Sequence, residues 1–88
     1  MTKRNKLEII RDILQIVKQN HKIKPTPLLR QSNISSSNFK QYYSELLEKE
    51  FIKENKEKNG KFISLTEKGE RFLEKYKAII NFIDEFEL

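Results

Sequence analysis

The chain has no cysteine and only two glycines, two prolines and one histidine among its 88 residues. Without cysteine it can form neither a disulfide framework nor a thiolate metal site, which fits a reducing compartment. The single histidine belongs to no Ser-His-Asp or His-Glu-x-x-His arrangement, and the two glycines form no phosphate-binding loop. We therefore expect no enzymatic activity, no metal, no cofactor and no evident small-molecule ligand.

Long hydrophobic segments are missing as well. No apolar run approaches the about 20 residues that a membrane-spanning helix needs. The basic N-terminus is not followed by the continuous apolar segment of a signal peptide. We expect no contact with membranes. A chain of this length is expected to form one small domain, and such domains often gain stability from a partner subunit.

Charge is distributed unevenly along the chain. Residues 1–44 carry nine Lys or Arg against two acidic residues, a net charge of +7. Residues 45–66 are neutral, and residues 67–88 have a net charge of −2. The overall +5 therefore comes from the N-terminal half. A local basic excess favours binding to a polyanion, although on charge alone plain solubility explains it equally well.

The basic half contains the most informative stretch, residues 26–50. Thr26 is expected to cap a short helix that starts at Pro27, and Ile34 to fill the corner after it. Ser35 is expected to cap a second helix with one apolar face, formed by Phe39, Tyr43, Leu46 and Leu47. A short helix, a tight turn and a longer helix with a small polar start are typical of a helix-turn-helix.

The segment before this stretch predicts a helix over residues 4–19 and a basic connector over 20–25, in which His21 is expected to be exposed. The helix has two neighbouring apolar stripes: Leu7, Ile10, Leu14 and Val17, and Ile9, Ile13 and Ile16. Together they are wider than one core face needs. Either the helix is buried on two sides within one chain, or Ile9 and Ile16 contact a second subunit.

Residues 51–65 predict a β-hairpin. Asn59-Gly60 is a strong hairpin signal, with positive φ expected at both residues, and Ile63 and Leu65 alternate with Phe62 and Ser64 at a period of two. A hairpin directly after the second helix of a helix-turn-helix is the wing of a winged helix. Three lysines lie around its tip: Lys56, Lys58 and Lys61. We interpret them as phosphate contacts, with protection of the sheet edge as the alternative.

The remaining residues predict a long helix that begins after Thr66. Gly69 in its first turn would weaken the helix, so close packing is expected there. Apolar residues at steps of 4, 3, 4 and 3 form a seam of about two heptads, which would expose a large apolar patch in a monomer. We expect a homodimer through Phe72, Tyr76, Ile79, Ile80, Ile83 and Phe86. The alternative is that the helix folds back over the first helix.

The order of these elements resembles winged-helix DNA-binding proteins, and more narrowly the small archaeal winged-helix family of chromatin proteins and predicted transcription regulators. The resemblance covers nearly the whole chain and rests on Asn33-Ile34-Ser35, Tyr42-Tyr43, Leu46-Leu47-Glu48-Lys49, Phe51-Ile52 and Leu65-Thr66-Glu67-Lys68-Gly69. It implies that the C-terminal helix pairs as an antiparallel coiled coil in a homodimer. The chain departs from the family at Glu50, where glycine is usual, and near Ser36, where an aromatic residue is common.

The resulting prediction is a mainly α fold with one β-hairpin, a winged helix-turn-helix over residues 1–66, and a dimerisation helix over 67–88 continuous with it. The chain is expected to be a homodimeric double-stranded DNA-binding protein of the cytoplasmic nucleoid, acting as a transcription regulator or an architectural chromatin protein. The recognition helix, residues 35–48, would enter the major groove. The wing, residues 52–65, would lie on the backbone or in the minor groove. A protein-interaction module that never touches DNA is the alternative.

The expected DNA contacts come from the helix-turn-helix and the wing. Asn38 and Gln41 have the chemistry to read adenine edges, and Lys40 to read guanine or bind phosphate. Serines beside the free N–H groups at the start of the recognition helix would favour a phosphate. The full set is Arg30, Ser36, Ser37, Asn38, Lys40, Gln41, Ser44, Lys56, Lys58 and Lys61.

Overall fold

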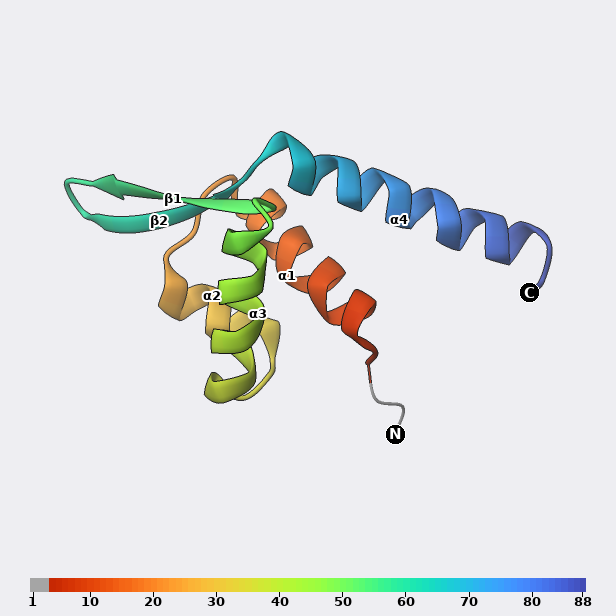
Figure 1. The fold of residues 1–88 in the computed structure, drawn as a ribbon, viewed down its shortest axis with the longest axis horizontal. Helices are drawn as coiled ribbons and strands as arrows, with labels where there is room; N and C mark the ends of the chain where they lie inside the picture. The colour runs from red at the N-terminus through yellow and green to blue at the C-terminus, as the bar shows by residue number, and fades with distance from the viewer. Residues whose placement is uncertain (1–3) are drawn as a thin grey trace.

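A computed structural model describes residues 4–88. Its elements are α1 (Lys6–Asn20), α2 (Pro25–Ser32), α3 (Ser36–Glu48), β1 (Ile52–Glu57), β2 (Gly60–Leu65) and α4 (Glu67–Glu85). The three N-terminal helices pack together, and the β1–β2 hairpin and the end of α4 project from them in opposite directions (Figure 1). The predicted combination of a mainly helical fold, one hairpin and a long C-terminal helix is confirmed.

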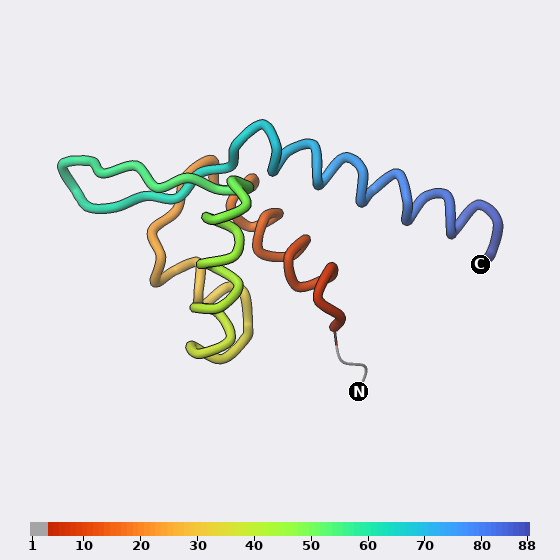
Figure 2. The backbone as a smooth tube through the Cα atoms, in the orientation of Figure 1, coloured from red at the N-terminus to blue at the C-terminus, as the bar shows by residue number. Residues whose placement is uncertain are grey.

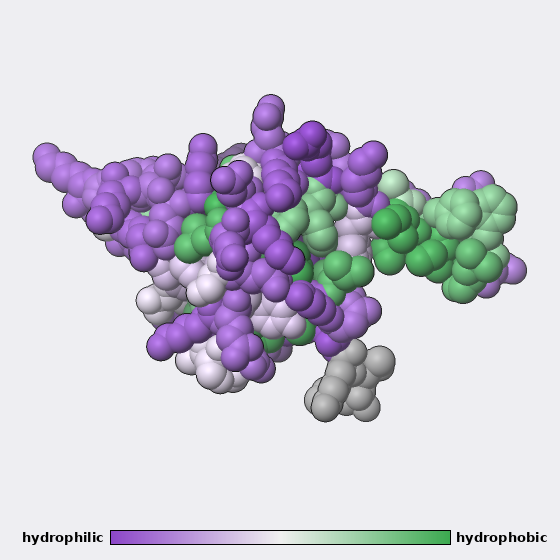
Figure 3. All heavy atoms as spheres, viewed as in Figure 1, coloured by the Kyte–Doolittle hydropathy of each residue, from purple (hydrophilic) through white to green (hydrophobic). Residues whose placement is uncertain are grey.

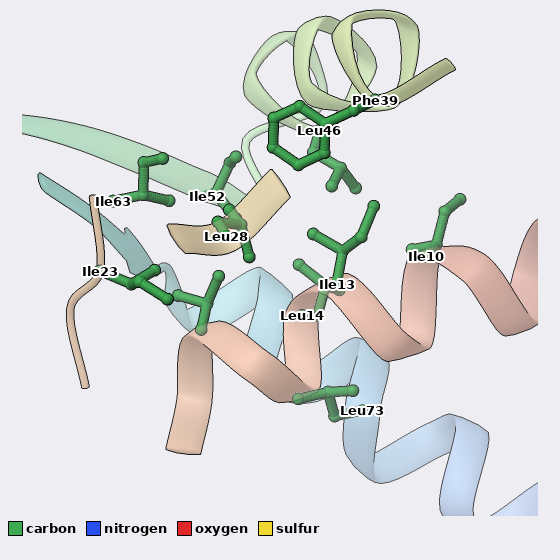
Figure 4. Packing of buried hydrophobic residues seen from close by; sticks show 11 residues of the cluster. Ile10, Ile13, Leu14, Ile23, Leu28, Phe39, Leu46, Ile52, Ile63 and Leu73 are labelled. Atoms are coloured by element: carbon green, nitrogen blue, oxygen red, sulfur yellow. The ribbon is translucent and has the colours of Figure 1, made fainter. Parts of the chain in front are cut away.

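Helix α1 is the element on which the others pack. It begins with a capping box, in which the Asn5 side chain accepts from the Glu8 N–H at 2.8 Å and the Glu8 carboxylate accepts from the Asn5 N–H at 3.3 Å. In Figure 4, its side chains lie between Phe39 and Leu46 of α3 on one side and Leu73 of α4 on the other. The buried core comprises Ile10, Ile13, Leu14, Val17, Ile23, Leu28, Phe39, Leu46, Ile52, Ile63 and Leu73.

The residues of the two apolar stripes predicted on α1 differ in how far they are buried. Ile9 and Ile16 are half-buried against the core of the same chain, whereas Leu7 is exposed. Packing within one chain therefore covers part of the second stripe. His21, which follows the helix, is exposed as expected.

Helix α2 begins two residues earlier than predicted. Its N-cap is Lys24, which makes no side-chain capping bond, and Pro25 occupies the first helical position. Pro25 lacks an N–H and holds Lys24 in an extended conformation, so it starts the helix before Thr26 could cap it. The helix ends at Asn33 in the left-handed conformation, where Arg4 donates to the Ser32 carbonyl at 3.1 Å.

Helix α3 begins as predicted and ends at a strained residue. The Ser35 hydroxyl accepts from the Asn38 N–H at 3.2 Å. At the other end, the Phe51 N–H donates to the Leu46 carbonyl at 2.9 Å, and the Glu50 N–H donates to the Leu47 carbonyl at 3.0 Å. These two bonds form a Schellman motif that requires Glu50 to take a φ of 61°. Glu50 thus adopts the conformation that glycine adopts more easily.

The hairpin turns one residue earlier than predicted. Its strands are antiparallel, with Ile52 opposite Leu65 and Glu57 opposite Gly60, so Lys58 and Asn59 form the loop. Gly60 has a φ of 125°, but Asn59 is not in the positive-φ region, and the expectation for Asn59 is wrong. A glycine at the last position suits a turn whose two central residues have negative φ.

The hairpin also pairs with a residue of the connector between α1 and α2, which the sequence did not predict. Ile23 forms a bridge with Ile63, in which the Ile23 N–H donates at 3.0 Å and the Ile63 N–H donates back at 2.8 Å. The connector between α1 and α2 accordingly passes beside the base of the hairpin in Figure 2. This bridge ties the hairpin to the helical body.

The start of α4 is locked against the end of α3. The Thr66 hydroxyl accepts from the Gly69 N–H at 3.1 Å and donates to the Glu50 carbonyl at 2.5 Å. Gly69 is buried, and a Cβ there would overlap the carbonyl oxygen of Phe51. That oxygen already accepts from the Thr66 N–H at 3.2 Å. The predicted close packing at Gly69 is confirmed.

Beyond this junction α4 leaves the core. Leu73 is buried, and Phe72 packs edge-on against Phe51 with ring centroids 5.3 Å apart. Further along, Ile79 is 59% exposed and Phe86 is 58% exposed. Figure 3 shows the resulting apolar end of α4, which lies far from the polar hairpin. No helix among residues 4–88 is both long and apolar enough to span a membrane.

Gly69→Ala tests the junction. Alanine improves helix propensity by about 1 kcal/mol, but overlap with a backbone oxygen forces the first turn of α4 away from Phe51 and costs about 1–3 kcal/mol. We expect a net loss of stability in urea unfolding followed by circular dichroism at fixed protein concentration. Glu70→Ala, at the exposed next position, should stay within about 0.5 kcal/mol of the parent. Equal stability of both variants would contradict the overlap.

Glu50→Gly tests the strain at the end of α3. A non-glycine residue in the left-handed region costs roughly 1–2 kcal/mol, and glycine adds about 0.5–1 kcal/mol of unfolded-state entropy. We therefore expect a net gain of up to about 1 kcal/mol. Lys49→Gly is the matched control, because Lys49 has a φ of −85° and glycine there should only destabilise. A loss of stability in both variants would argue against strain at Glu50.

Candidate nucleic-acid interface

The side chains assigned to DNA contact are all accessible. One comes from α2, six come from α3 and three come from the hairpin, and each of these ten residues is exposed: Arg30, Ser36, Ser37, Asn38, Lys40, Gln41, Ser44, Lys56, Lys58 and Lys61. The surface is therefore available to a ligand without rearrangement of the core.

Helix α3 presents these residues along two flanks. A groove of about 370 Å³ separates α3 from α2 and the hairpin, and its lining comprises Pro25, Thr26, Leu29, Ser36, Phe39, Lys40, Tyr43, Ser44 and Lys61. A second groove, of about 320 Å³, lies between α1 and α3 and contains Asn38 and Gln41 beside Lys6 and Glu45. The first groove brings Lys40 and the serines of α3 next to Lys61 of the wing. The amides of Asn38 and Gln41 lie in the second groove, on the flank of α3 that faces α1.

The two faces of the hairpin carry different groups. Alternation along the strands places Glu54, Lys56 and Lys61 on the same face as buried Ile52 and Ile63, and this face is turned toward α3. On the opposite face, the ammonium groups of Lys22 and Lys24 lie 4.7 Å and 5.6 Å from the ring centroid of Phe62. Basic groups thus flank the wing on both sides.

Lys22 and Lys24 were missed in the sequence analysis. Both are exposed, and Lys22 pairs with Glu57 at 2.7 Å. The alternation Lys-Ile-Lys around buried Ile23 was the available signal, since it is the pattern of a strand with one buried face. Three residues are too few to predict a strand, so the partner β2 had to be known first.

Glu54 links the wing to α3. The Tyr43 hydroxyl donates to the Glu54 carboxylate, and the Lys61 ammonium lies 3.2 Å from the same oxygen. Burial, reinforced by the Glu54 carboxylate, raises the pKa of Tyr43. The hydrogen bond from Tyr43 lowers the pKa of Glu54, with Lys61 and Lys56 adding to the effect against the cost of desolvation. Glu54 is therefore a carboxylate at neutral pH, held by a neutral phenol and the Lys61 ammonium, with the charge of Lys56 nearby.

The acids toward the end of α3 have a structural environment of their own. Glu45 pairs with Lys6 of α1 at 3.0 Å and approaches Lys49 at 4.0 Å. The hydrogen bond from Lys6 and the nearby Lys49 charge lower the pKa of Glu45. Tyr42 is half-buried, as expected for a packing residue at the border of the core face. Glu48 is exposed at the last turn.

The residues assigned to the dimer interface divide between the body and the end of α4. Phe72 and Tyr76 are half-buried, and the Arg11 guanidinium lies 5.2 Å from the Tyr76 ring centroid. Ile83 is half-buried, whereas Ile79, Ile80 and Phe86 are exposed. A groove of about 470 Å³ between α1 and α4 is lined by Arg11, Gln15, Lys18, Leu73, Glu74, Tyr76, Lys77 and Ile80.

Among residues 4–88, no three His, Cys, Asp or Glu side chains are grouped as metal ligands.

Two proteins of Methanocaldococcus jannaschii are related in sequence. The uncharacterized protein MJ0290 is 37% identical over 81 residues, which are 92% of this chain and 36% of that protein. The uncharacterized protein MJ0287 is 39% identical over 69 residues, which are 78% of this chain and 66% of that protein. The chain thus spans about a third of one relative and about two thirds of the other.

Several solved structures share the fold. Sso10a-2, a DNA-binding protein from Sulfolobus solfataricus, has a TM-score of 0.75 at 22% identity, covering 94% of this chain and 85% of its own. F-93 of SSV1 has a TM-score of 0.70 at 26% identity, and the match covers 89% of this chain and 91% of F-93. F93 of STIV, a winged-helix DNA-binding protein, has a TM-score of 0.71 at 18% identity, covering 89% and 91%.

A comparison with models of protein families matches most of the chain. A model of the winged helix-turn-helix family matches residues 3–84. The order of elements agrees with it, because two helices precede the recognition helix and an antiparallel hairpin follows at once. From this match and this architecture, the chain belongs to the winged helix-turn-helix family.

Proposed function

We propose that the chain is a homodimeric double-stranded DNA-binding protein, with residues 1–66 as the DNA-binding part and residues 67–88 as the dimerisation helix. The observation that carries the DNA-binding part is the groove that brings Lys40 and two serines of α3 together with Lys61 of the wing. Ammonium and hydroxyl groups around an open groove suit a phosphodiester backbone. Two solved structures with the same fold are described as DNA-binding proteins, which supports the same function.

Each element has a distinct task in this proposal. The N-terminal end of α3 enters the major groove, where Ser36 and Ser37 stand beside the free N–H groups of the helix. Asn38 and Gln41 face base edges from the α1 flank, and Lys40 faces them or a phosphate from the wing flank. Four basic side chains contact the backbone or the minor groove: Arg30, Lys56, Lys58 and Lys61.

The surface favours weak discrimination between sequences. Most of its groups are short hydroxyls and flexible lysines, which bind phosphates of any sequence, and few are amides that read bases. A transcription regulator and an architectural chromatin protein would both use such a surface. Either role places the protein on the nucleoid.

The exposed end of α4 supports the homodimer. A soluble monomer rarely exposes a contiguous apolar patch of this kind, and pairing around a two-fold axis would cover it on both chains. In an antiparallel pair, Tyr76 of one subunit meets Phe86 of the other, and Ile79 meets Ile83. Tyr76 and Ile83 are a positions of the heptad repeat, and Ile79 and Phe86 are d positions. Each pairing therefore places an a position opposite a d position, as an antiparallel coiled coil requires.

Charge complementarity favours the same arrangement. The end of α4 carries Asp84, Glu85 and Glu87, while the groove between α1 and α4 is lined by three cations, Arg11, Lys18 and Lys77, and by one acid, Glu74. Antiparallel pairing brings the acidic end of each chain toward the basic rim of the other, whereas parallel pairing brings acidic ends together. The opposite charges therefore favour the antiparallel orientation.

Lys58→Ala and Gln41→Ala separate phosphate contact from base reading. Loss of Lys58 should weaken binding to all duplexes alike and reduce the slope of log affinity against log salt by about 0.9 per lysine. Loss of Gln41 should instead change the ranking of duplexes of different sequence, because it removes a base contact. Fluorescence anisotropy with labelled duplexes at about 50 and 200 mM salt measures both effects.

Arg71→Ala is the control for these variants. Arg71 is exposed on α4 among Glu67, Glu70 and Glu74 and lines neither groove that contains the proposed DNA contacts, so its loss should leave affinity unchanged. DNA affinity that is insensitive to both Lys58→Ala and Gln41→Ala would reject the proposed surface.

Cysteine crosslinking tests the dimer and its orientation, since the chain has no cysteine of its own. A mixture of Tyr76→Cys and Phe86→Cys chains should form disulfide-linked dimers on mild oxidation, because these positions meet across an antiparallel pair. Either variant alone should crosslink poorly. Non-reducing electrophoresis separates the products.

Sedimentation of the unmodified chain accompanies the crosslinking. We expect twice the chain mass of 10.6 kDa. Efficient crosslinking of each variant with itself would indicate a parallel pair, and a single-chain mass at micromolar concentration would exclude the dimer.

A further inference from the structure

Glu54 is an acidic side chain placed within the proposed DNA surface. It lies diagonally across the strand pair from Lys61, because Glu54 is opposite Ile63 and both Glu54 and Lys61 point to the same face. Its carboxylate receives the Tyr43 hydroxyl from α3 and pairs with the Lys61 ammonium at 3.2 Å. Tyr43 and Lys61 also line the groove between α3 and the wing. A carboxylate next to this groove would repel a phosphodiester backbone.

The base of the hairpin has anchors other than this acid. The hairpin is already fixed at its base by the Ile23–Ile63 bridge and by buried Ile52 and Ile63. The Glu54 and Lys61 side chains remain 31% and 42% exposed. Exposed ion pairs add little to stability. A neutral side chain could accept the Tyr43 hydrogen bond, so the negative charge of Glu54 calls for an explanation other than folding.

We propose that Glu54 is an internal counter-anion, which occupies Lys61 in the free protein and gives it up to a DNA phosphate when the duplex binds. Tyr43 keeps hold of the carboxylate during this exchange and so positions the wing against α3. The exchange replaces one anion by another on the same ammonium group. The consequence is a lower affinity for arbitrary duplexes, which makes binding depend more on the contacts of α3. This inference rests on the DNA-binding function proposed above.

The charge state of the cluster fits an exchange of ligands rather than a proton switch. The Tyr43 hydrogen bond and the two neighbouring lysines lower the pKa of Glu54, so it stays ionised at neutral pH. Burial and Glu54 raise the pKa of Tyr43, so the phenol stays a neutral donor. Lys56 faces the same carboxylate and stays beside it when Lys61 turns to a phosphate.

Glu54→Gln is the central test. Glutamine keeps the shape and can accept the Tyr43 hydrogen bond, but it carries no charge. We expect affinity for a random-sequence duplex to rise roughly two- to fivefold at low salt, the range of an exposed ion pair. The salt slope should steepen by up to about 0.9 per subunit, because Lys61 is no longer neutralised in the free protein.

Glu57→Gln is the matched control. It removes the same charge from the same strand, but Glu57 lies on the opposite face and pairs with Lys22 at 2.7 Å. If Glu54 acts through Lys61 rather than through net charge, Glu57→Gln should raise affinity less. Equal effects of the two variants would overturn the role of Glu54 while leaving DNA binding intact.

A measurement on the free protein checks the positioning role separately. Ultraviolet titration of tyrosinate should show that Glu54→Ala, which removes both the charge and the hydrogen-bond acceptor, lowers the pKa of Tyr43 toward its ordinary value. Tyr43→Phe identifies the contribution of Tyr43. An unchanged pKa would mean that Glu54 does not hold the phenol, and would overturn that role. Failure of the parent chain and of Glu54→Gln to bind any duplex at low salt would instead overturn the DNA-binding function, and this inference with it.

Discussion

The close approach of Gly69 to the Phe51 carbonyl is the contact on which the rest of the arrangement depends. It lets the first turn of α4 lie directly against the end of the Schellman motif that closes α3, and Thr66 bonds across the same junction. Any larger residue at Gly69 would push the first turn of α4 away from Phe51. The strained φ of Glu50 belongs to the same junction, because it directs the chain from α3 into β1.

The wing and the apolar end of α4 lie on opposite sides of the helical body. The wing leaves the helical body in one direction and the apolar end of α4 in the other, as Figures 1 and 3 show. The groove that gathers Lys40 and Lys61 lies between α3 and the wing, and the groove with Arg11 and Lys77 lies between α1 and α4. A duplex and a second copy of the chain could therefore bind at the same time without competing for one surface.

The wing is more than a projection of lysines. Lys61 is paired with Glu54, and Lys22 is paired with Glu57, so part of its positive charge is balanced within the free protein. Lys24 lies beside the wing because the adjacent residue, Ile23, forms a bridge with Ile63. Counting basic residues thus overstates the free charge of the wing and, at the same time, misses a basic residue beside it.

The sequence by itself determined the features that depend on local chemistry. Ser35 and Thr66 cap their helices, Gly69 marks a close approach, and the alternation around Ile63 marks a strand, because each signal acts within a few residues of itself. Local signals failed where two of them competed, since Pro25 started α2 before Thr26 could, and the turn settled around Lys58 rather than Gly60. Only the tertiary structure decided that Ile23 joins β2 and that Glu54 holds both Tyr43 and Lys61. Those contacts join separate elements, and no periodicity along the chain specifies which side chains meet when the elements pack.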